Sequence, residues 1–243
     1  MRRASLLRVF GLWTGANGMP ERRRACWSTF RVTGLEPVLV TPDNLEEWIV
    51  PGRPLHPAYE HLSVTHRADY LRAYLMHHHG GGYADIKRQA SSWLPAVEKV
   101  LRSRWLMGAG YAEIRGGAPR LHLNEVDGRY RLVTLPVPRV VARIATEAMR
   151  AAFPLMIGNG GFFLKPRTAY TSCWIAEVER RLDVLLPALR RHPGKDPRGR
   201  AGDGSGYPVP WTFLFGDITN PLSLILAPWL SRRLPRPSFE DYL

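Results

Sequence analysis

Cysteine is scarce in this chain of 243 residues, which contains only Cys26 and Cys173. Two cysteines build neither a disulfide framework nor, by themselves, a structural zinc site. The chain also lacks any run of the ~20 apolar residues that a membrane-spanning helix needs. Arg8 interrupts the apolar stretch that follows the basic residues 1–3, so we expect no cleavable signal peptide. We therefore expect a cytoplasmic protein with reduced cysteines.

Acidic side chains are fewer than basic ones. Asp and Glu number 21 against 34 Lys and Arg, which leaves a formal net charge of +13 at pH 7. Such a surplus favours anionic partners: nucleotide phosphates, nucleic acid or an acidic membrane surface. The arginines are spread along the chain, and no helix-turn-helix, zinc-finger or RNP pattern accompanies them. A basic nucleic-acid-associated protein therefore stays an alternative that rests on charge alone.

The first part of the chain alternates strand and helix patterns. Residues 5–13 and 37–41 are apolar runs that predict buried strands, and residues 21–33 predict a helix between them. Asp43, followed three residues later by Glu46, forms a capping-box pattern that predicts the start of a second helix. Strands that alternate with helices are typical of a parallel sheet with crossover helices, so we expect an α/β fold.

A third helix is predicted over residues 63–79, where apolar and aromatic residues recur at helical spacing. Three glycines at 80–82 predict its abrupt end, because glycine tolerates the left-handed backbone conformation found there. An extended segment is expected over residues 81–86. The three histidines at 77–79 do not predict a metal site, since successive helical side chains point ~100° apart.

The second half of the chain has a less regular pattern. Asp127-Gly128 is a hairpin signal that predicts strands over residues 121–126 and 129–135. No repeat and no linker divides the chain, which indicates a single domain over residues 1–243. The other expected elements are an amphipathic helix at 140–153, a glycine-interrupted strand or loop at 156–164, a helix with Trp174, Val178, Leu182 and Leu185 on its inner face, and a mobile loop at 192–210.

A polar constellation occurs at the end of the third helix. Asp69 and Arg72 are three residues apart and share one helix face. After the glycines, Tyr83, Asp85 and Lys87 alternate along the extended segment and so face the same side. Carboxylates and cations that converge at a glycine-rich turn suit a ligand with both hydroxyls and phosphates.

This pattern, Asp-x-x-Arg, ten further residues, then Tyr-x-Asp after a Gly-Gly pair, resembles the signature of glycosyltransferases with a sugar-binding region containing a DxD motif. Mannosyltransferase-like and capsular polysaccharide synthesis enzymes belong to this group. The resemblance is strong over residues 61–88 and implies a GT-A fold, a Rossmann-like mixed sheet flanked by helices that binds a nucleotide diphosphate sugar at the carboxyl ends of its strands. It implies hexosyl transfer to a saccharide or lipid-linked saccharide acceptor in surface polysaccharide or glycoconjugate synthesis. Residues 1–90 would bind the donor, and residues 91–243 would form the acceptor side.

The resemblance carries over to single positions of the donor site. Asp69 and Arg72 match the pair that binds the hydroxyls of the donor sugar. Asp85 matches the first motif aspartate, which contacts ribose and sugar and helps to hold a metal ion. Trp13 looks like the aromatic residue that stacks on the nucleotide base, although a core position is the alternative. The neighbouring residues Thr14, Gly82 and Tyr83 complete the expected donor site.

The acceptor side is expected around Asn159, Trp211 and Asp217. Asn159 precedes two glycines, where the backbone could approach a ligand closely, and a plain turn is the alternative. Residues 211–217 either close over the diphosphate or pack on the sheet. If the reaction inverts the sugar configuration, it needs a carboxylate base, for which Glu113, Glu125 and Asp217 are the candidates; the relatives suggest retention, which needs none.

Lys87 departs from the family pattern, because it stands where the second motif aspartate normally binds Mn²⁺ or Mg²⁺. A protonated lysine does not coordinate a hard cation. We favour the interpretation that Lys87 supplies the metal's positive charge, so that Arg72, Asp85 and Lys87 form a metal-independent catalytic group. The alternatives are an inactive protein that only binds nucleotide sugar, and a metal held by Asp85 with a later residue such as Asp217.

The C-terminal segment 221–234 is apolar and then basic. It predicts either a helix docked on the core or a contact with an anionic bilayer, which would suit a lipid-linked acceptor. In the second case the protein would lie peripherally at the inner face of the membrane.

Overall fold

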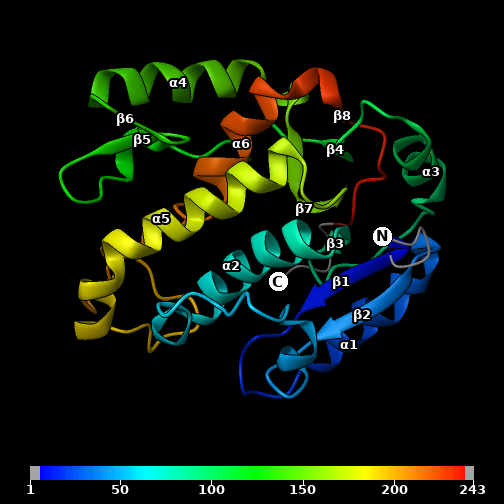
Figure 1. The fold of residues 1–243 in the computed structure, drawn as a ribbon, viewed down its shortest axis with the longest axis horizontal. Helices are drawn as coiled ribbons and strands as arrows, with labels where there is room; N and C mark the ends of the chain where they lie inside the picture. Colours follow the sequence, from blue (N-terminus) through cyan, green and yellow to red (C-terminus); the bar gives the residue numbers. More distant parts are fainter. Residues whose placement is uncertain (1–5, 239–243) are drawn as a thin grey trace.

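The computed structural model describes residues 6–238 and has an α/β fold with a mixed six-stranded sheet flanked by helices, as the sequence predicted (Figure 1). The strand order is β2-β1-β3-β7-β4-β8. β1 pairs in parallel with both β2 and β3, whereas β7 is antiparallel to β3 and β4, and β8 is parallel to β4. The strands are β1 (Arg8–Leu12), β2 (Glu36–Val40), β3 (Gly81–Ala84), β4 (Gly108–Ala112), β7 (Ile157–Leu164) and β8 (Leu230–Ser231), with a separate hairpin of β5 (Tyr130–Leu132) and β6 (Leu135–Val137).

Helices cover both faces of the sheet. The α-helices are α1 (Glu21–Ser28), α2 (Val64–His78), α3 (Leu94–Arg102), α4 (Arg139–Ala151), α5 (Ala169–Arg191) and α6 (Gly216–Ile225). Short 3₁₀ helices are η2 (Thr29–Thr33), η3 (Leu45–Trp48), η4 (Tyr59–His61), η5 (Leu121–Leu123), η6 (Phe153–Leu155) and η7 (Ala227–Trp229). No helix among residues 6–238 is long and apolar enough to cross a membrane.

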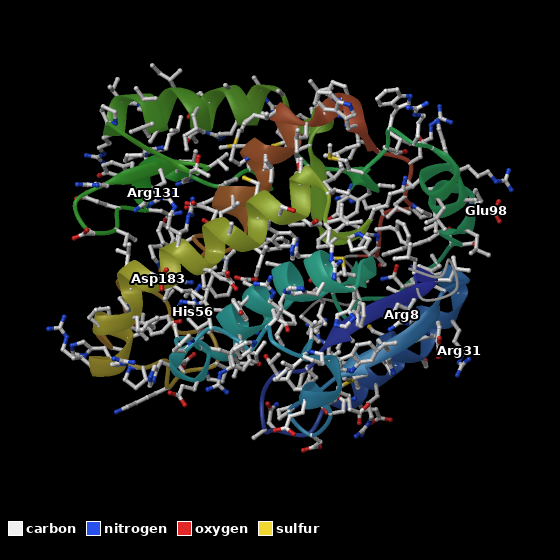
Figure 2. All side chains as sticks on the ribbon, viewed as in Figure 1. Arg8, Arg31, His56, Glu98, Arg131 and Asp183 are labelled. Atoms are coloured by element: carbon white, nitrogen blue, oxygen red, sulfur yellow. The ribbon has the colours of Figure 1, made fainter. Side chains whose placement is uncertain are left out.

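Strand alternation divides the core into two layers. Phe162 of β7 belongs to the buried cluster that includes side chains of α2, α5 and α6. Phe163, the next residue, belongs to the cluster on the opposite face, with side chains of α1 and α3. Successive side chains of a strand point to opposite faces, so the run Phe162-Phe163 joins the two layers through the middle of the sheet. Nε2 of His56 and Oδ1 of Asp183 lie 3.0 Å apart, and this hydrogen bond ties the segment before α2 to α5 (Figure 2).

The prediction of the third helix is confirmed by α2. Ser63 caps its first turn and accepts a hydrogen bond from the backbone N–H of His66. At the other end, Gly80 and Gly81 have φ angles of 66° and 100°, which only glycine adopts without strain. The glycines therefore turn the chain directly from α2 into β3.

The helix predicted to start at Asp43 is wrong. Only the short η3 forms there, and no side chain caps it. The Oδ1 atom of Asn44 accepts from the backbone N–H of Thr41 at 2.9 Å, and its Nδ2 donates to the carbonyl of Leu39 at 3.0 Å. These bonds hold the chain in a turn, because an asparagine side chain competes with the helical pattern.

The hairpin prediction is only partly correct. Val126 and Arg129 form an isolated bridge around Asp127-Gly128, whose φ angles are both positive. The residues before the bridge do not form a strand, because Leu121 is buried in η5 against α4. The strands β5 and β6 pair across a later turn that contains Val133.

Candidate functional site

The structure brings the predicted polar residues together where the parallel strands β1 and β3 end. Arg72 of α2 binds Oδ1 of Asp69 through Nη1 at 3.0 Å and Oδ1 of Asp85 through Nη2 at 3.2 Å. The Tyr83 hydroxyl donates to Oδ1 of Asp85 at 2.8 Å, and the Lys87 ammonium lies 2.9 Å from Oδ2. We call Asp69, Arg72, Tyr83, Asp85 and Lys87 the polar cluster.

Asp85 and Lys87 meet although the strand has already ended at Ala84. The backbone N–H of Lys87 donates to the carbonyl oxygen of Asp85 at 2.6 Å, which makes a tight turn. This turn brings the Lys87 side chain back toward Asp85, and strand alternation is therefore not the cause of their contact.

Two aromatic rings hold the Arg72 guanidinium in place. Its Cζ atom lies 4.6 Å from the ring centre of Tyr83 and 4.6 Å from that of Phe215. Cation–π contacts of this kind stabilise an arginine that has lost part of its hydration. Nε of Arg72 is buried and has no hydrogen-bond partner among the described residues. The cluster thus contains a preorganised cation with one unused donor.

The two carboxyl groups differ in their electrostatic environment. Burial raises the pKa of Asp69 to about 6, although the Arg72 charge acts in the opposite direction. Burial also acts to raise the pKa of Asp85, but the charges of Arg72 and Lys87 outweigh it and hold that pKa below its usual value. The Asp85 side chain is 20% exposed, whereas that of Asp69 is 5% exposed. Asp85 is therefore the ionised carboxylate that solvent and ligands reach most easily.

A divalent cation does not fit the donors around Asp85. Oδ1 is bonded by Arg72 and Tyr83, and Oδ2 is bonded by Lys87. A metal ion bound to this carboxylate would stand next to two cations, and hard cations require several oxygen ligands. No group of three or more His, Cys, Asp or Glu side chains within residues 6–238 is arranged to hold a metal.

β7 forms a wall of the polar cluster that the sequence analysis missed. The carbonyl of Gly160 accepts from the backbone N–H of Asp85 at 3.0 Å, and its N–H donates to the Tyr111 hydroxyl at 3.1 Å. A Cβ atom at Gly160 would lie 3.3 Å from Oδ2 of Asp85 and 3.5 Å from Nζ of Lys87. The glycine pair after Asn159 was a signal of this close approach, whereas nothing in the local sequence pointed to Tyr111.

Glu113 is the candidate base nearest to this wall. Its carboxylate accepts from the backbone N–H groups of Ile114 at 2.8 Å and Asn159 at 3.2 Å. Burial raises its pKa, and these hydrogen bonds and the charge of Lys87 act in the opposite direction. A carboxyl group with a raised pKa, close to the cluster, has the properties of a general base.

The other expected donor-site residues divide into two groups. Trp13 and Thr14 follow β1 at the same edge of the sheet. The Trp13 indole is partly buried and donates to the carbonyl of Asn17 at 2.7 Å, while the Thr14 hydroxyl donates to the carbonyl of Val64 at 2.8 Å. Gly82 is buried within β3, where a Cβ would meet the side chains of the opposite core layer. The structure thus places Gly82 in the core and not in the cluster.

Two of the three expected acceptor-side residues, Asn159 and Asp217, use their side chains in hydrogen bonds within the protein. Asn159 donates to Oδ1 of Asn220 at 2.8 Å and accepts from the Thr219 hydroxyl at 3.1 Å. Asp217 is 3% exposed, and Asn124 and Thr212 donate to its carboxylate. Burial raises its pKa.

Trp211 differs from these buried residues, because its side chain is largely exposed and lies beside the His66 ring. Of the three expected acceptor residues, Trp211 is therefore the one that presents a large side chain to solvent.

Comparison of the chain with models of known protein families, with curated protein sequences and with solved structures finds no match. Function is therefore inferred from the polar cluster and its surroundings.

Proposed function

We propose that this protein is a glycosyltransferase with a GT-A-like fold, which transfers a hexosyl group from a nucleotide diphosphate sugar to an acceptor hydroxyl. The observation that carries the proposal is the chain of ion pairs from Asp69 through Arg72 and Asp85 to Lys87. It lies where two neighbouring parallel strands end, which is the edge at which open α/β sheets bind ligands. Carboxylates for sugar hydroxyls and cations for phosphates are the groups that a sugar diphosphate requires.

In the proposed complex, the carboxylates and the cations of the cluster have separate tasks. Asp69 and Asp85 bind hydroxyls of the sugar and ribose, and Trp13 stacks on the base. Lys87 and Arg72 face the diphosphate, where Nε of Arg72 offers the buried donor that has no partner within residues 6–238. The fixed position of the Arg72 guanidinium between two rings supports this assignment, because a preorganised cation loses little entropy on binding.

The transfer breaks the bond between the anomeric carbon and a diphosphate oxygen, and the bonding electrons stay on that oxygen. A new bond forms between the anomeric carbon and the acceptor oxygen through an oxocarbenium-like transition state. Lys87 and Arg72 offset the charge that develops on the departing diphosphate. In a retaining course, the diphosphate oxygen accepts the proton of the acceptor hydroxyl; in an inverting course, Glu113 accepts it.

The test combines binding and turnover. UDP-hexoses and GDP-hexoses, each with and without Mn²⁺, should include one that raises the melting temperature, since a ligand that binds only the folded state stabilises it. The same donor should be consumed by transfer or slow hydrolysis. Asp85→Asn should remove both effects, and Glu98→Gln on α3, whose side chain is 45% exposed, is the matched control.

Each other outcome has a defined meaning. If no common nucleotide sugar shifts the melting temperature, the proposal is wrong. Binding without any turnover would identify the inactive nucleotide-sugar-binding alternative. DNA binding that weakens steeply with salt and persists in Asp85→Asn would favour the nucleic-acid alternative.

We propose further that an anionic membrane surface presents a lipid-linked acceptor, with the protein peripheral at the inner face of the membrane. The segment predicted for this contact, residues 221–234, forms the end of α6, then η7 and β8, and within it Ile225 is 62% and Trp229 is 39% exposed. Further exposed apolar side chains occur on α4, where Val140 is 62% and Ile144 is 65% exposed. Exposed arginines on the same helix, Arg139 and Arg143, supply the charge complementarity to an acidic bilayer.

A further inference from the structure

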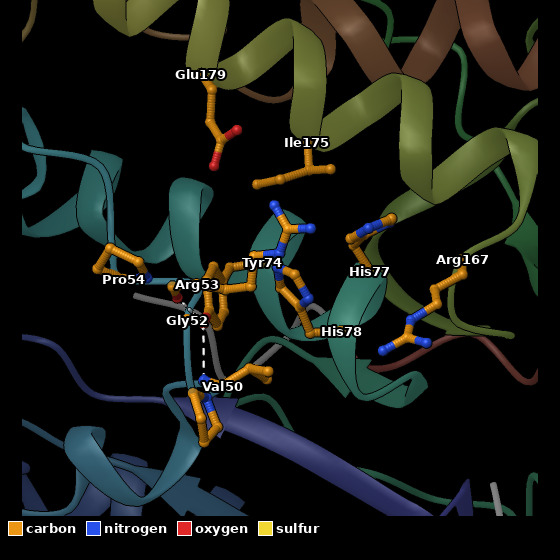
Figure 3. Close-up of a pocket in the computed structure, with 11 residues that line it drawn as sticks. Val50, Gly52, Arg53, Pro54, Tyr74, His77, His78, Arg167, Ile175 and Glu179 are labelled. Carbon is orange, nitrogen blue, oxygen red and sulfur yellow. Dashed lines mark hydrogen bonds between the residues drawn. The ribbon is translucent and has the colours of Figure 1, made fainter.

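A polar hollow lies apart from the polar cluster. Its volume is about 720 Å³, within the usual range for small-molecule sites, and no residue of the cluster lines it. Figure 3 shows it between the C-terminal end of α2, the 50–54 turn, the loop before α5 and one face of α5. The groups that matter are Arg53, His77, His78, Arg167 and Glu179.

The backbone that carries Arg53 is fixed to α2. Residues 50–53 form a turn in which the N–H of Arg53 donates to the carbonyl of Val50 at 2.9 Å, with Gly52 at a φ of 76°. The Tyr74 hydroxyl accepts from the N–H of Val50 at 2.9 Å and donates to the carbonyl of Arg53 at 2.5 Å. The Tyr74 hydroxyl is thus hydrogen-bonded to both ends of the 50–53 turn.

Arg167 is held on the other side of the hollow. Its N–H donates to the carbonyl of His77 at 3.2 Å, and its φ of 55° is left-handed. Left-handed backbone at a residue other than glycine is strained and persists where the surroundings fix it, often at ligand sites. Both arginines are therefore attached through their backbones to the helix that carries the histidines (Figure 3).

Neither guanidinium is neutralised within the described part of the chain. The side chains of Arg53 and Arg167 make no hydrogen bond and no ion pair among residues 6–238. Nδ1 of His77 is buried and has no hydrogen-bond partner there. Glu179 is the one acidic side chain in the lining, so two permanent cations face one carboxylate.

The pKa values of His77 and His78 are lowered by the positive charge around the hollow. Burial lowers the pKa of His77, and the charges of Arg167 and Arg53 lower it further. The same causes, with the neighbouring histidines, lower the pKa of His78 to about 4. On α5, burial raises the pKa of Glu179, while Arg53 and His56 act against it. An anion in the hollow would therefore be attracted by both guanidiniums, and its negative charge would raise the pKa values of His77 and His78.

We propose that this hollow binds a small organic phosphate, a phosphomonoester that carries hydroxyl groups. The phosphate lies between Arg53 and Arg167, whose planar guanidinium groups match its oxygens, and Nδ1 of His77 donates to it when protonated. Glu179 accepts hydrogen bonds from the hydroxyl groups. The volume exceeds what inorganic phosphate alone would fill, which favours an organic ester. The site is independent of the sugar-transfer proposal.

The test is calorimetric titration with glucose 6-phosphate, inorganic phosphate and glucose at constant ionic strength. We expect glucose 6-phosphate to bind more tightly than phosphate, and glucose not to bind. Arg53→Gln and Arg167→Gln should each weaken binding at least about 10-fold, the size of one lost charge-assisted contact. Arg31→Gln in η2, where Arg31 is exposed, is the matched control and should leave binding unchanged.

A second measurement separates ligand binding from a purely structural role. Proton NMR should show the pKa values of His77 and His78 rising when glucose 6-phosphate is added, because the phosphate offsets the arginine charges. Equal binding by the wild type and both arginine variants would overturn the proposal, as would unchanged histidine pKa values at saturation. Vesicles with phosphatidic acid test a lipid source: capture that depends on both arginines, without any binding of soluble phosphates, would overturn the small-molecule assignment.

Discussion

The Lys87 ammonium and the Asp85 carboxylate form an ion pair of 2.9 Å across a turn of two residues. The same carboxylate binds Arg72 through its other oxygen. In the proposed site the Lys87 ammonium supplies the positive charge that a bound metal ion supplies in metal-dependent sites, and unlike a metal ion it cannot dissociate. If the proposed sugar transfer takes place at this site, its rate should respond to mutation of Lys87 and not to chelators.

Lys87→Ala should abolish most turnover, by about 100-fold or more, as expected when one preorganised group that stabilises developing charge is removed. EDTA should leave the wild-type rate unchanged. Lys87→Asp should gain a dependence on Mn²⁺, because two carboxylates would then face the cation position. Steady-state kinetics with and without EDTA and Mn²⁺ measure all three effects, and a wild-type enzyme inactivated by EDTA would contradict the role given to Lys87.

Gly160→Ala tests the wall behind the cluster. The new methyl group would lie 3.0 Å from the Tyr111 hydroxyl and 3.3 Å from Oδ2 of Asp85, which forces both to shift by a few tenths of an ångström. We expect turnover to fall more than 10-fold, because small displacements of catalytic groups are costly. Gly18→Ala is the control, since a Cβ there meets nothing within 4 Å. Equal kinetics of the two variants would exclude a contribution of Gly160 to the site.

His66 makes stability depend on pH. It is fully buried, its Nδ1 lies 2.9 Å from the Ser63 hydroxyl and 3.0 Å from that of Tyr207, and burial lowers its pKa to about 4. The unfolded chain takes up this proton near pH 6.5, whereas the folded chain takes it up only near pH 4. Stability from this group is therefore present above pH 6.5 and is lost as the pH falls toward 4, by about 3 kcal/mol in total.

The measurement is urea unfolding of the wild type and His66→Gln from pH 7.5 to pH 4. Asp69, whose pKa burial raises to about 6, has the opposite effect, because the folded state binds its proton more tightly as the pH falls. The difference between the two proteins removes that contribution. The difference in the free energy of unfolding between the wild type and His66→Gln should shrink toward pH 4. If that difference is independent of pH, His66 is not buried in its neutral form.

Ile144→Glu and Val140→Glu should reduce sedimentation with vesicles that contain anionic lipid, since each places a negative charge on the exposed apolar face of α4. Loss of at least half of the bound fraction is expected. Val32→Glu is the control, because Val32 is 47% exposed but lies in η2. If the wild-type protein does not sediment with anionic vesicles, the exposed face of α4 is not a membrane contact.

The sequence predicts the half of the site that lies within one continuous segment. Asp69, Arg72 and Asp85 are close along the chain, so helical spacing and a glycine turn are enough to bring them together. Gly160 and Tyr111 reach the cluster only because β7 pairs antiparallel with β3 and β4. No local pattern encodes a pairing between strands so far apart in sequence, and this part of the site was therefore missed.

Side-chain hydrogen bonds that the sequence pattern does not reveal account for two other differences. Asp217 occurs in a segment with turn-like and apolar neighbours, and sequence alone did not show that Asn124 would fold against it. The capping box at Asp43 failed because the adjacent Asn44 offers the backbone a competing set of hydrogen bonds. At Asp43 a local helix-start signal was overruled by one neighbouring polar side chain, whereas at Asp217 the partner comes from a distant part of the chain.

The antiparallel position of β7 also determines the order in which the molecule can be assembled during synthesis. β3 has β1 on one side and β7 on the other, so its second edge stays unpaired until the ribosome has passed residue 164. Contacts of this sequence separation close late, because a long loop must be ordered first. A fragment that ends near residue 90 would thus carry the residues of the polar cluster but leave the strand beside them with an open edge prone to aggregation.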